Sequence, residues 1–213
     1  MIKTNVWSIA SLLVAISISI STYATAPASV GTVIIAKGDV QLVRNNKPHA
    51  LKRKEQLQKG DRIITGMKSR ARLRMIDNAI LTLGANTEFV INHYQYSANE
   101  KQGSARVELF KGVMRAVTGA IGKTQDRDFL LKTSAATIGV RGTDFWVGDI
   151  FSTSLDVALI SGKGVYVENK AGRVEIITAG HGTTVKDQDT QPTKPKRWGD
   201  KKYNMALESV FLE

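Results

Sequence analysis

The stretch RARLRMIDNAILTL, residues 70–83, decides the fold class of this chain. In its first half, small or apolar residues alternate with basic ones: Ala71, Leu73 and Met75 with Arg70, Arg72 and Arg74. This period of two predicts a β-strand whose apolar face is buried and whose arginine face meets water. The following Asp77-Asn78 pair predicts a tight turn, and residues 79–83 predict a second strand.

Short apolar runs separated by glycine and polar turns extend in both directions, from Val30 to Val185. Because no convincing helical stripe interrupts them, we predict an all-β fold with many short strands in a solenoid-like or sandwich-like single domain. Three strand–glycine–strand units, at Gly38, Gly112 and Gly164, resemble one another but are irregularly spaced. Their spacing argues against a regular repeat array and leaves stacked β-arches as an alternative.

The N-terminal segment predicts export from the cytoplasm. Lys3 precedes an apolar run from Val6 to Ile20, and two A-x-A triplets follow within residues 24–28. This order is typical of a secretory signal peptide, here residues 1–28, whose removal would leave a periplasmic or secreted protein. The alternative is an uncleaved anchor, but the run is short for a bilayer span. Membrane contact is expected only through this segment, and only if it stays uncleaved.

The C-terminal segment differs in composition from the β-domain, which we assign to residues 29–186. Residues 187–213 begin as a polar, proline-containing linker and predict a short C-terminal helix. Tyr203, Leu207 and Val210 would share one helical face, and Asp200 would cap the start. Such a short helix is marginal alone, so we expect it to fold back onto the β-domain rather than to dock on a partner.

The charge balance favours an anionic partner. Lys and Arg total 30 against 19 acidic residues, which gives a formal net charge of +11. An envelope protein or an anionic envelope polymer fits this charge, and the alternative is a basic surface that only aids solubility. No recognition helix, zinc finger or paired aromatic RNA motif accompanies the basic residues, so specific nucleic-acid binding is not expected.

The search for catalytic motifs gives no positive result. The sequence VTGAIGKT ends like a phosphate-binding loop, but Val117 stands where the first glycine is needed. His49, His93 and His181 have no metal-binding spacing, and the chain has no cysteine and no G-x-S-x-G motif. We therefore expect no enzymatic activity, no metal and no cofactor.

The most unusual stretch is ATIGVRGTDFWV, residues 136–147, because Arg141 stands between two glycines in an apolar context. One interpretation is an internal clamp, in which the guanidinium pairs with nearby Asp144. The other is a grip on an anionic ligand. We favour the clamp, because an acidic partner lies close in sequence. The candidate site comprises Gly139, Val140, Arg141, Gly142, Thr143, Asp144 and Phe145.

This stretch resembles the signature of the FecR-type domain family, a small apolar residue followed by V-R-G-T, any residue, F, any residue and V. The segments GDRIITG…LTLGANTEFVI, ELFKGVMRAV and SGKGVYVENKAGRVEIITAG are similar to further family segments. The resemblance covers about Val30 to Val185. It implies an extracytoplasmic β-rich domain, which in the best-known members senses an outer-membrane transporter and relays to a sigma factor. It supplies no catalytic residues.

This chain departs from the complete relay arrangement. Five residues precede the apolar run, so we expect no cytoplasmic anti-sigma domain and a free-standing periplasmic FecR-type domain. Our main functional hypothesis is a non-enzymatic binding or scaffold module of the bacterial cell envelope. The alternatives are a membrane-anchored signalling regulator and, less favoured, an envelope glycan hydrolase.

Overall fold

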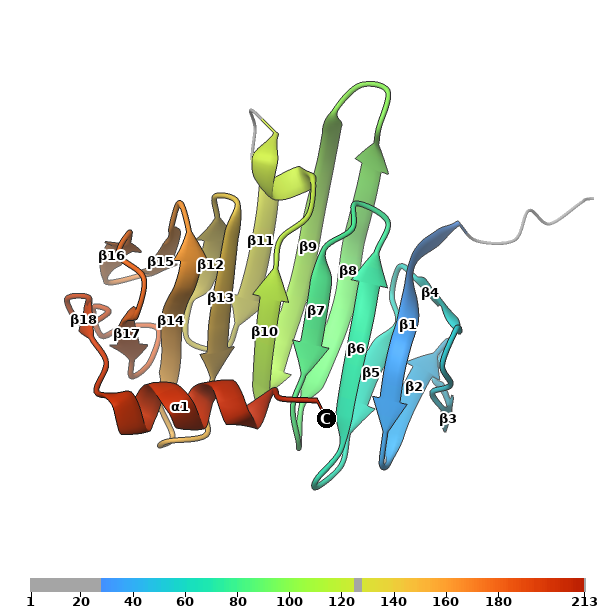
Figure 1. The fold of residues 1–213 in the computed structure, drawn as a ribbon, viewed down its shortest axis with the longest axis horizontal. Coiled ribbons are helices and arrows are strands. Elements are labelled where there is room, and N and C mark those ends of the chain that lie inside the picture. Colours follow the sequence, from blue (N-terminus) through green and yellow to red (C-terminus); the bar gives the residue numbers. More distant parts are fainter. Residues whose placement is uncertain (1–27, 125–127, 213) are drawn as a thin grey trace, which may run out of the picture.

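The computed structural model describes residues 28–124 and 128–212, in which two large β-sheets face each other and one α-helix lies outside them (Figure 1). The predicted all-β class, with solenoid-like and sandwich-like character, is confirmed. The predicted signal peptide lies outside the described residues, apart from Ala28. Within the described ranges, no helix has the length and apolarity needed to cross a membrane.

Sheet A is the front layer in Figure 1, and within the described residues it has nine strands. Along the sheet they are β18 (Lys196–Arg197), β17 (His181–Val185), β14 (Leu155–Gly162), β13 (Thr143–Gly148), β10 (Val113–Val117), β7 (Ile80–Leu83), β6 (Arg70–Met75), β1 (Ser29–Lys37) and β4 (Gln56–Gln58). All the described neighbours in this sheet are antiparallel.

Sheet B is the rear layer, and its described part also has nine strands. In order they are β16 (Gly172–Ile176), β15 (Val165–Asn169), β12 (Thr137–Val140), β11 (Asp128–Thr133), β9 (Gln102–Lys111), β8 (Glu88–Ser97), β5 (Arg62–Thr65), β2 (Val40–Arg44) and β3 (Lys47–Ala50). The β9–β11 pair is parallel, because the chain crosses to sheet A for β10 and a short 3-10 helix, η1 (Ile121–Lys123), before it returns.

The chain therefore passes back and forth between the sheets while it advances along the long axis (Figure 1). Alternating side chains from both sheets fill the space between them. In β6, Ala71, Leu73 and Met75 are buried, as their alternation predicted. Phe129 of β11 and Phe145 of β13 are fully buried in the same core. Burial of each large apolar side chain stabilises the fold by about 1.5–3 kcal/mol.

Buried threonines bind backbone groups where the chain leaves a sheet ladder. The Thr65 hydroxyl donates to the Gly84 carbonyl at 2.6 Å and accepts the Thr87 N–H at 2.9 Å. The Thr87 hydroxyl in turn donates to the Val113 carbonyl at 3.1 Å and accepts the Val113 N–H at 3.0 Å. These hydroxyls supply the partners that buried backbone groups need when no neighbouring strand provides them.

A buried carboxylate performs the same role at the predicted Asp77-Asn78 turn. Asn78 has a φ of 66°, which a tight turn of this kind requires and asparagine tolerates. The Asp77 carboxylate accepts hydrogen bonds from the Tyr94 hydroxyl at 2.7 Å and from the Ile121 N–H at 3.1 Å. Burial, together with the adjacent Asp77 charge, raises the pKa of Tyr94 far above its usual range. The phenol therefore stays protonated and keeps donating to the carboxylate.

The predicted C-terminal helix is present as α1 (Asp200–Ser209), which lies across the outer face of sheet A (Figure 1). It buries Ala206 and the following Val210 in a second apolar cluster with Trp146 and Trp198. The Trp146 indole also donates to the Ser209 hydroxyl at 3.0 Å. The helix therefore folds back onto the β-domain.

Two details of α1 differ from the sequence-based expectation. The N-cap residue is Gly199, with no side-chain hydrogen bond, and Asp200 is the first helical residue rather than the cap. Asp200 still lies in the first turn, where a negative charge is favoured by the helix dipole. Leu207 is only half-buried, whereas Ala206 packs fully against the sheet.

The α1 contact predicts a strong dependence of stability on Trp146. Trp146→Ala should lower the free energy of unfolding by about 3–5 kcal/mol, because it removes a fully buried ring between helix and sheet. Phe211→Ala is the control, since Phe211 is 66% exposed, and it should change stability by no more than about 0.5 kcal/mol. Urea unfolding measures both values. Equal effects of the two substitutions would show that α1 does not pack as described.

Candidate functional site

The signature residues 139–145 form a corner where the chain leaves β12 in sheet B and enters β13 in sheet A. Gly142 has a φ of 68°, a conformation that favours glycine. Thr143 is buried, and its hydroxyl donates to the Gly164 carbonyl at 2.8 Å and accepts the Gly164 N–H at 3.2 Å. The Thr143 N–H also donates to the Thr118 hydroxyl at 2.8 Å. This corner therefore depends on hydroxyl groups that bind backbone.

Arg141 does not pair with Asp144, so the expected partner is wrong. The Arg141 side chain is 40% exposed, and its Nη2 lies 3.4 Å from Oε1 of Glu175, a loose contact. Asp144 binds Arg115 instead through two contacts of 2.9 and 2.7 Å. The hydrogen bond to Asp144 raises the pKa of Arg115, against the opposing effect of burial. Arg141 lies in the bend between β12 and β13, whereas Asp144 lies in β13 beside Arg115 of β10, which sequence distance does not show.

The other signature residues serve packing. Val140 and Phe145 are buried in the core between the sheets. Gly139 lies opposite Tyr166 in the β12–β15 ladder, and a Cβ at position 139 would lie 2.0 Å from the Tyr166 ring. The Arg173 guanidinium covers that ring at 3.8 Å from its centroid, a cation–π arrangement. Glycine at position 139 thus makes room for a tyrosine that lies across the outer face of sheet B.

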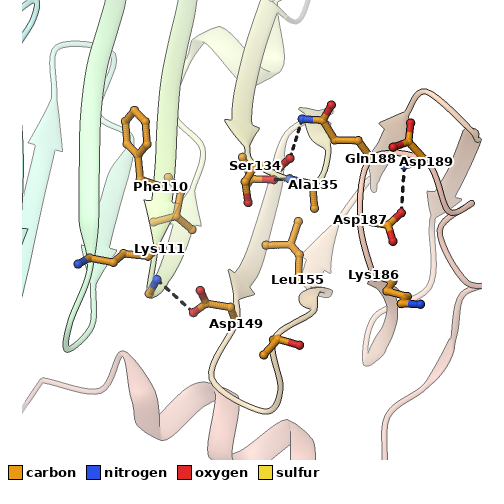
Figure 2. Close-up of a pocket in the computed structure, with 14 residues that line it drawn as sticks. Phe110, Lys111, Ser134, Ala135, Asp149, Leu155, Lys186, Asp187, Gln188 and Asp189 are labelled. Carbon is orange, nitrogen blue, oxygen red and sulfur yellow. Dashed lines mark hydrogen bonds between the residues drawn. The ribbon is translucent and has the colours of Figure 1, made fainter.

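A surface cleft opens at the end of the sandwich that α1 approaches (Figure 2). Its volume is about 370 Å³. Four separate segments line it: residues 109–112 at the end of β9, residues 133–135 in the β11–β12 turn, the β13–β14 connection up to Leu155, and residues 186–189 after β17. The cleft therefore joins segments from both sheets.

The cleft combines a small apolar base with a charged rim. Ala135 and Leu155 are nearly buried, whereas Phe110 on the rim is 45% exposed. Lys111 and Lys186 contribute positive charges, and Asp149, Asp187 and Asp189 contribute negative charges. A segment that offers one apolar side chain and both polar and charged groups matches this lining.

Hydrogen bonds fix the polar walls of the cleft. The Asp149 carboxylate accepts the Gly112 N–H at 3.1 Å, and the Gln188 amide donates to the Ser134 carbonyl at 2.7 Å (Figure 2). Asp187 accepts the N–H groups of Asp189 and Thr190. The hydrogen bond with the Thr190 side chain is the main cause of a pKa of Asp187 below its usual range. Both carboxylates act as acceptors for backbone N–H groups.

The three histidines do not form a site. His49 contacts Glu55 at 2.7 Å at the β3 edge, and His93 contacts Ser104 at 2.7 Å in the β8–β9 hairpin. His181 lies in β17 of the other sheet. In the described ranges, no group of three or more histidine, aspartate or glutamate side chains is placed to hold a metal ion.

Sequence reasoning missed the cleft and the role of Thr143. The cleft brings together residues 109–112 and 186–189, which no local motif links. Thr143 lay within the quoted signature, and a threonine directly after a turn glycine was the available indication that its hydroxyl binds backbone.

Comparison with known proteins supports the fold and the family. Residues 61–165 match the family described as FecR protein. Two crystal structures of a proposed anti-sigma factor from Parabacteroides distasonis ATCC 8503 share the fold, each with a TM-score of 0.53 and 16% identity. The similarity covers 68% of this chain and 64% and 63% of the solved chains, so this chain spans less than two thirds of their length. No curated protein matches the chain significantly.

The corner predicts which signature residue stabilises the fold. Thr143→Val keeps the side-chain shape but leaves the buried Gly164 N–H without its partner and removes one of two hydrogen bonds to the Gly164 carbonyl, so it should cost about 1–3 kcal/mol. Arg141→Ala should cost no more than about 1 kcal/mol, because the Glu175 contact is long and exposed. Thermal unfolding of both variants tests this order. A larger loss for Arg141→Ala would restore the clamp interpretation.

Proposed function

Because this chain carries a FecR-type domain, we propose that it is a non-enzymatic signalling regulator that acts by binding another protein. The observation that carries the proposal is the family match over residues 61–165, which includes the signature corner and three of the four cleft segments. The fold shared with the Parabacteroides distasonis protein, a proposed anti-sigma factor, supports the same class of function.

The cleft in Figure 2 is the part of the surface best suited to receive the partner. Recognition residues commonly lie on loops that a rigid scaffold positions, and here the lining comes from the ends of strands in both sheets. Phe110 offers an exposed aromatic anchor next to Lys111, and aromatic anchors with charged rims are typical of protein interfaces. A bound segment would contact both sheets at once.

We place the regulator outside the cytoplasm, on the strength of the signal-peptide pattern in residues 1–28. A binding or scaffold module of the cell envelope is the second candidate. The mixed charge of the cleft and the net charge of +11 fit a binding module as well as they fit a regulator, but the family match favours regulation. Glycan hydrolysis has little support, since a general acid needs a raised pKa and the pKa of Asp187 is lowered.

A cleft-filling variant tests the proposal in cells. Ser134 is exposed and lines the cleft, so Ser134→Trp should fill it without replacing a core residue. Ser161→Trp is the matched control, because Ser161 is also exposed and lies near the other end of β14. Transcript profiles are compared among cells that express the wild type, either variant or no protein.

We expect cells with Ser134→Trp to show the same transcript changes as the deletion strain, which expresses no protein, and cells with Ser161→Trp to match the wild type. Unfolding curves of the purified variants exclude a general loss of fold. An unchanged transcript profile in the deletion strain would refute signalling regulation. A wild-type profile for Ser134→Trp, together with an altered profile in the deletion, would refute only the role of the cleft.

A further inference from the structure

A strip of positive charge crosses the outer face of sheet A beside α1. Arg70, Arg72 and Arg74 alternate along β6 and point away from the core, and Lys37 and Lys68 lie at the same end as Arg70. We call these five residues the arginine strip. Figure 1 shows that α1 crosses β14, β13 and β10 and leaves β6 and β1 uncovered.

The arginines of the strip are not neutralised by an ion pair in the described part of the chain, although Glu208 of α1 lines the same cavity as Lys37, Lys68 and Arg70. None of the three arginines there forms an ion pair, and the Nε atoms of Arg70 and Arg72 are buried without a hydrogen-bond partner. Arg115, two strands away on the same face, differs because it is bound at two points by Asp144. Arg115 is therefore neutralised by a carboxylate, whereas the arginines of the strip are not.

The neighbouring strands do not neutralise the strip either. Arg72 lies between Ile35 and Thr82, and Arg74 lies between Thr32 and Ile80. Arg70 lies opposite Lys37, a second cation. Like charges that face each other across strands destabilise a sheet, and a half-buried donor without a partner adds to that cost. An anionic ligand on the outer face would reduce the like-charge repulsion.

We infer that the arginine strip binds an extended acidic segment of a partner protein, in which carboxylates occur at alternate positions. Alternate residues of an extended strand lie about 6.6–6.8 Å apart, so the guanidiniums of the strip and the carboxylates of such a segment have the same repeat. Guanidinium also suits carboxylate because its donors bind both oxygens at once. The inference rests on the proposed function, since it assumes a protein partner.

The surroundings of the strip favour an extended segment over a membrane surface. A cavity of about 340 Å³ lies between Lys37, Lys68 and Arg70 on one side and Glu208, Phe211 and Leu212 on the other. The chain that follows α1 thus forms a wall beside the strip. A helix is about 10 Å across, so α1 would hold a flat bilayer away from the sheet, whereas a single strand fits beside it.

Two isomeric peptides test this inference. One short capped peptide alternates glutamate and threonine, and the other has the same composition with its glutamates in one block. Fluorescence anisotropy measures binding to the full chain. We expect tighter binding of the alternating peptide, and about tenfold weaker binding of that peptide to Arg72→Gln. Arg74→Gln, at a more exposed position, is a second variant in case Arg72→Gln unfolds.

Lys132→Gln is the matched control, because Lys132 is an exposed cation on sheet B, and it should leave the peptide affinity unchanged. Equal binding of both peptides, or equal losses in Arg72→Gln and Lys132→Gln, would overturn the inference and indicate non-specific charge. Binding to vesicles of phosphatidylcholine and phosphatidylglycerol, without binding to either peptide, would overturn it in favour of a membrane. None of these outcomes bears on the transcript test of the cleft.

Discussion

The structure depends on hydrogen bonds that pair the backbone N–H and carbonyl groups each time the chain crosses between the two sheets. A strand inside a sheet has partners on both sides, but a crossing segment loses them while it remains buried. Threonine hydroxyls solve this problem repeatedly. Thr65 and Thr87 form one connected set, and Thr118 and Thr143 form another. Without these bonds, each crossing would leave buried N–H and carbonyl groups unpaired, and the two layers would not stay in register.

The same crossings give the candidate site its rigidity. The cleft forms where β9, β11, β13 and β17 end, so its lining residues are positioned by strands rather than by long loops. Asp149 and Gln188 then fix the walls by binding backbone groups of other segments. A regulator needs a surface that keeps its shape until a partner arrives, because preorganised groups lose less entropy on binding.

Much of the fold could be predicted from sequence because local periodicity determines it. The alternation in β6 and the Asp77-Asn78 turn are local patterns, and both are present as expected. The predicted Arg141–Asp144 pair is absent because Arg141 lies in the two-residue corner between the sheets, and the Asp144 carboxylate binds Arg115 of β10 instead. The cleft could not be predicted, since its segments meet only after both sheets have formed. The N-cap of α1 is Gly199 rather than the expected Asp200, a difference of one residue that the sequence alone does not resolve.

The winding order of the strands also affects how the domain is assembled. Each sheet adds its strands almost in the order of synthesis, from β1 and β2, next to the edge strands β4 and β3, to β18 and β16 at the other end. A growing chain can therefore extend the sandwich stepwise. At each intermediate stage, an edge strand of each sheet has unpaired backbone groups that the next strand can bind. On the front layer the last strand, β18, has only two residues, so this edge offers little backbone to which another chain could add.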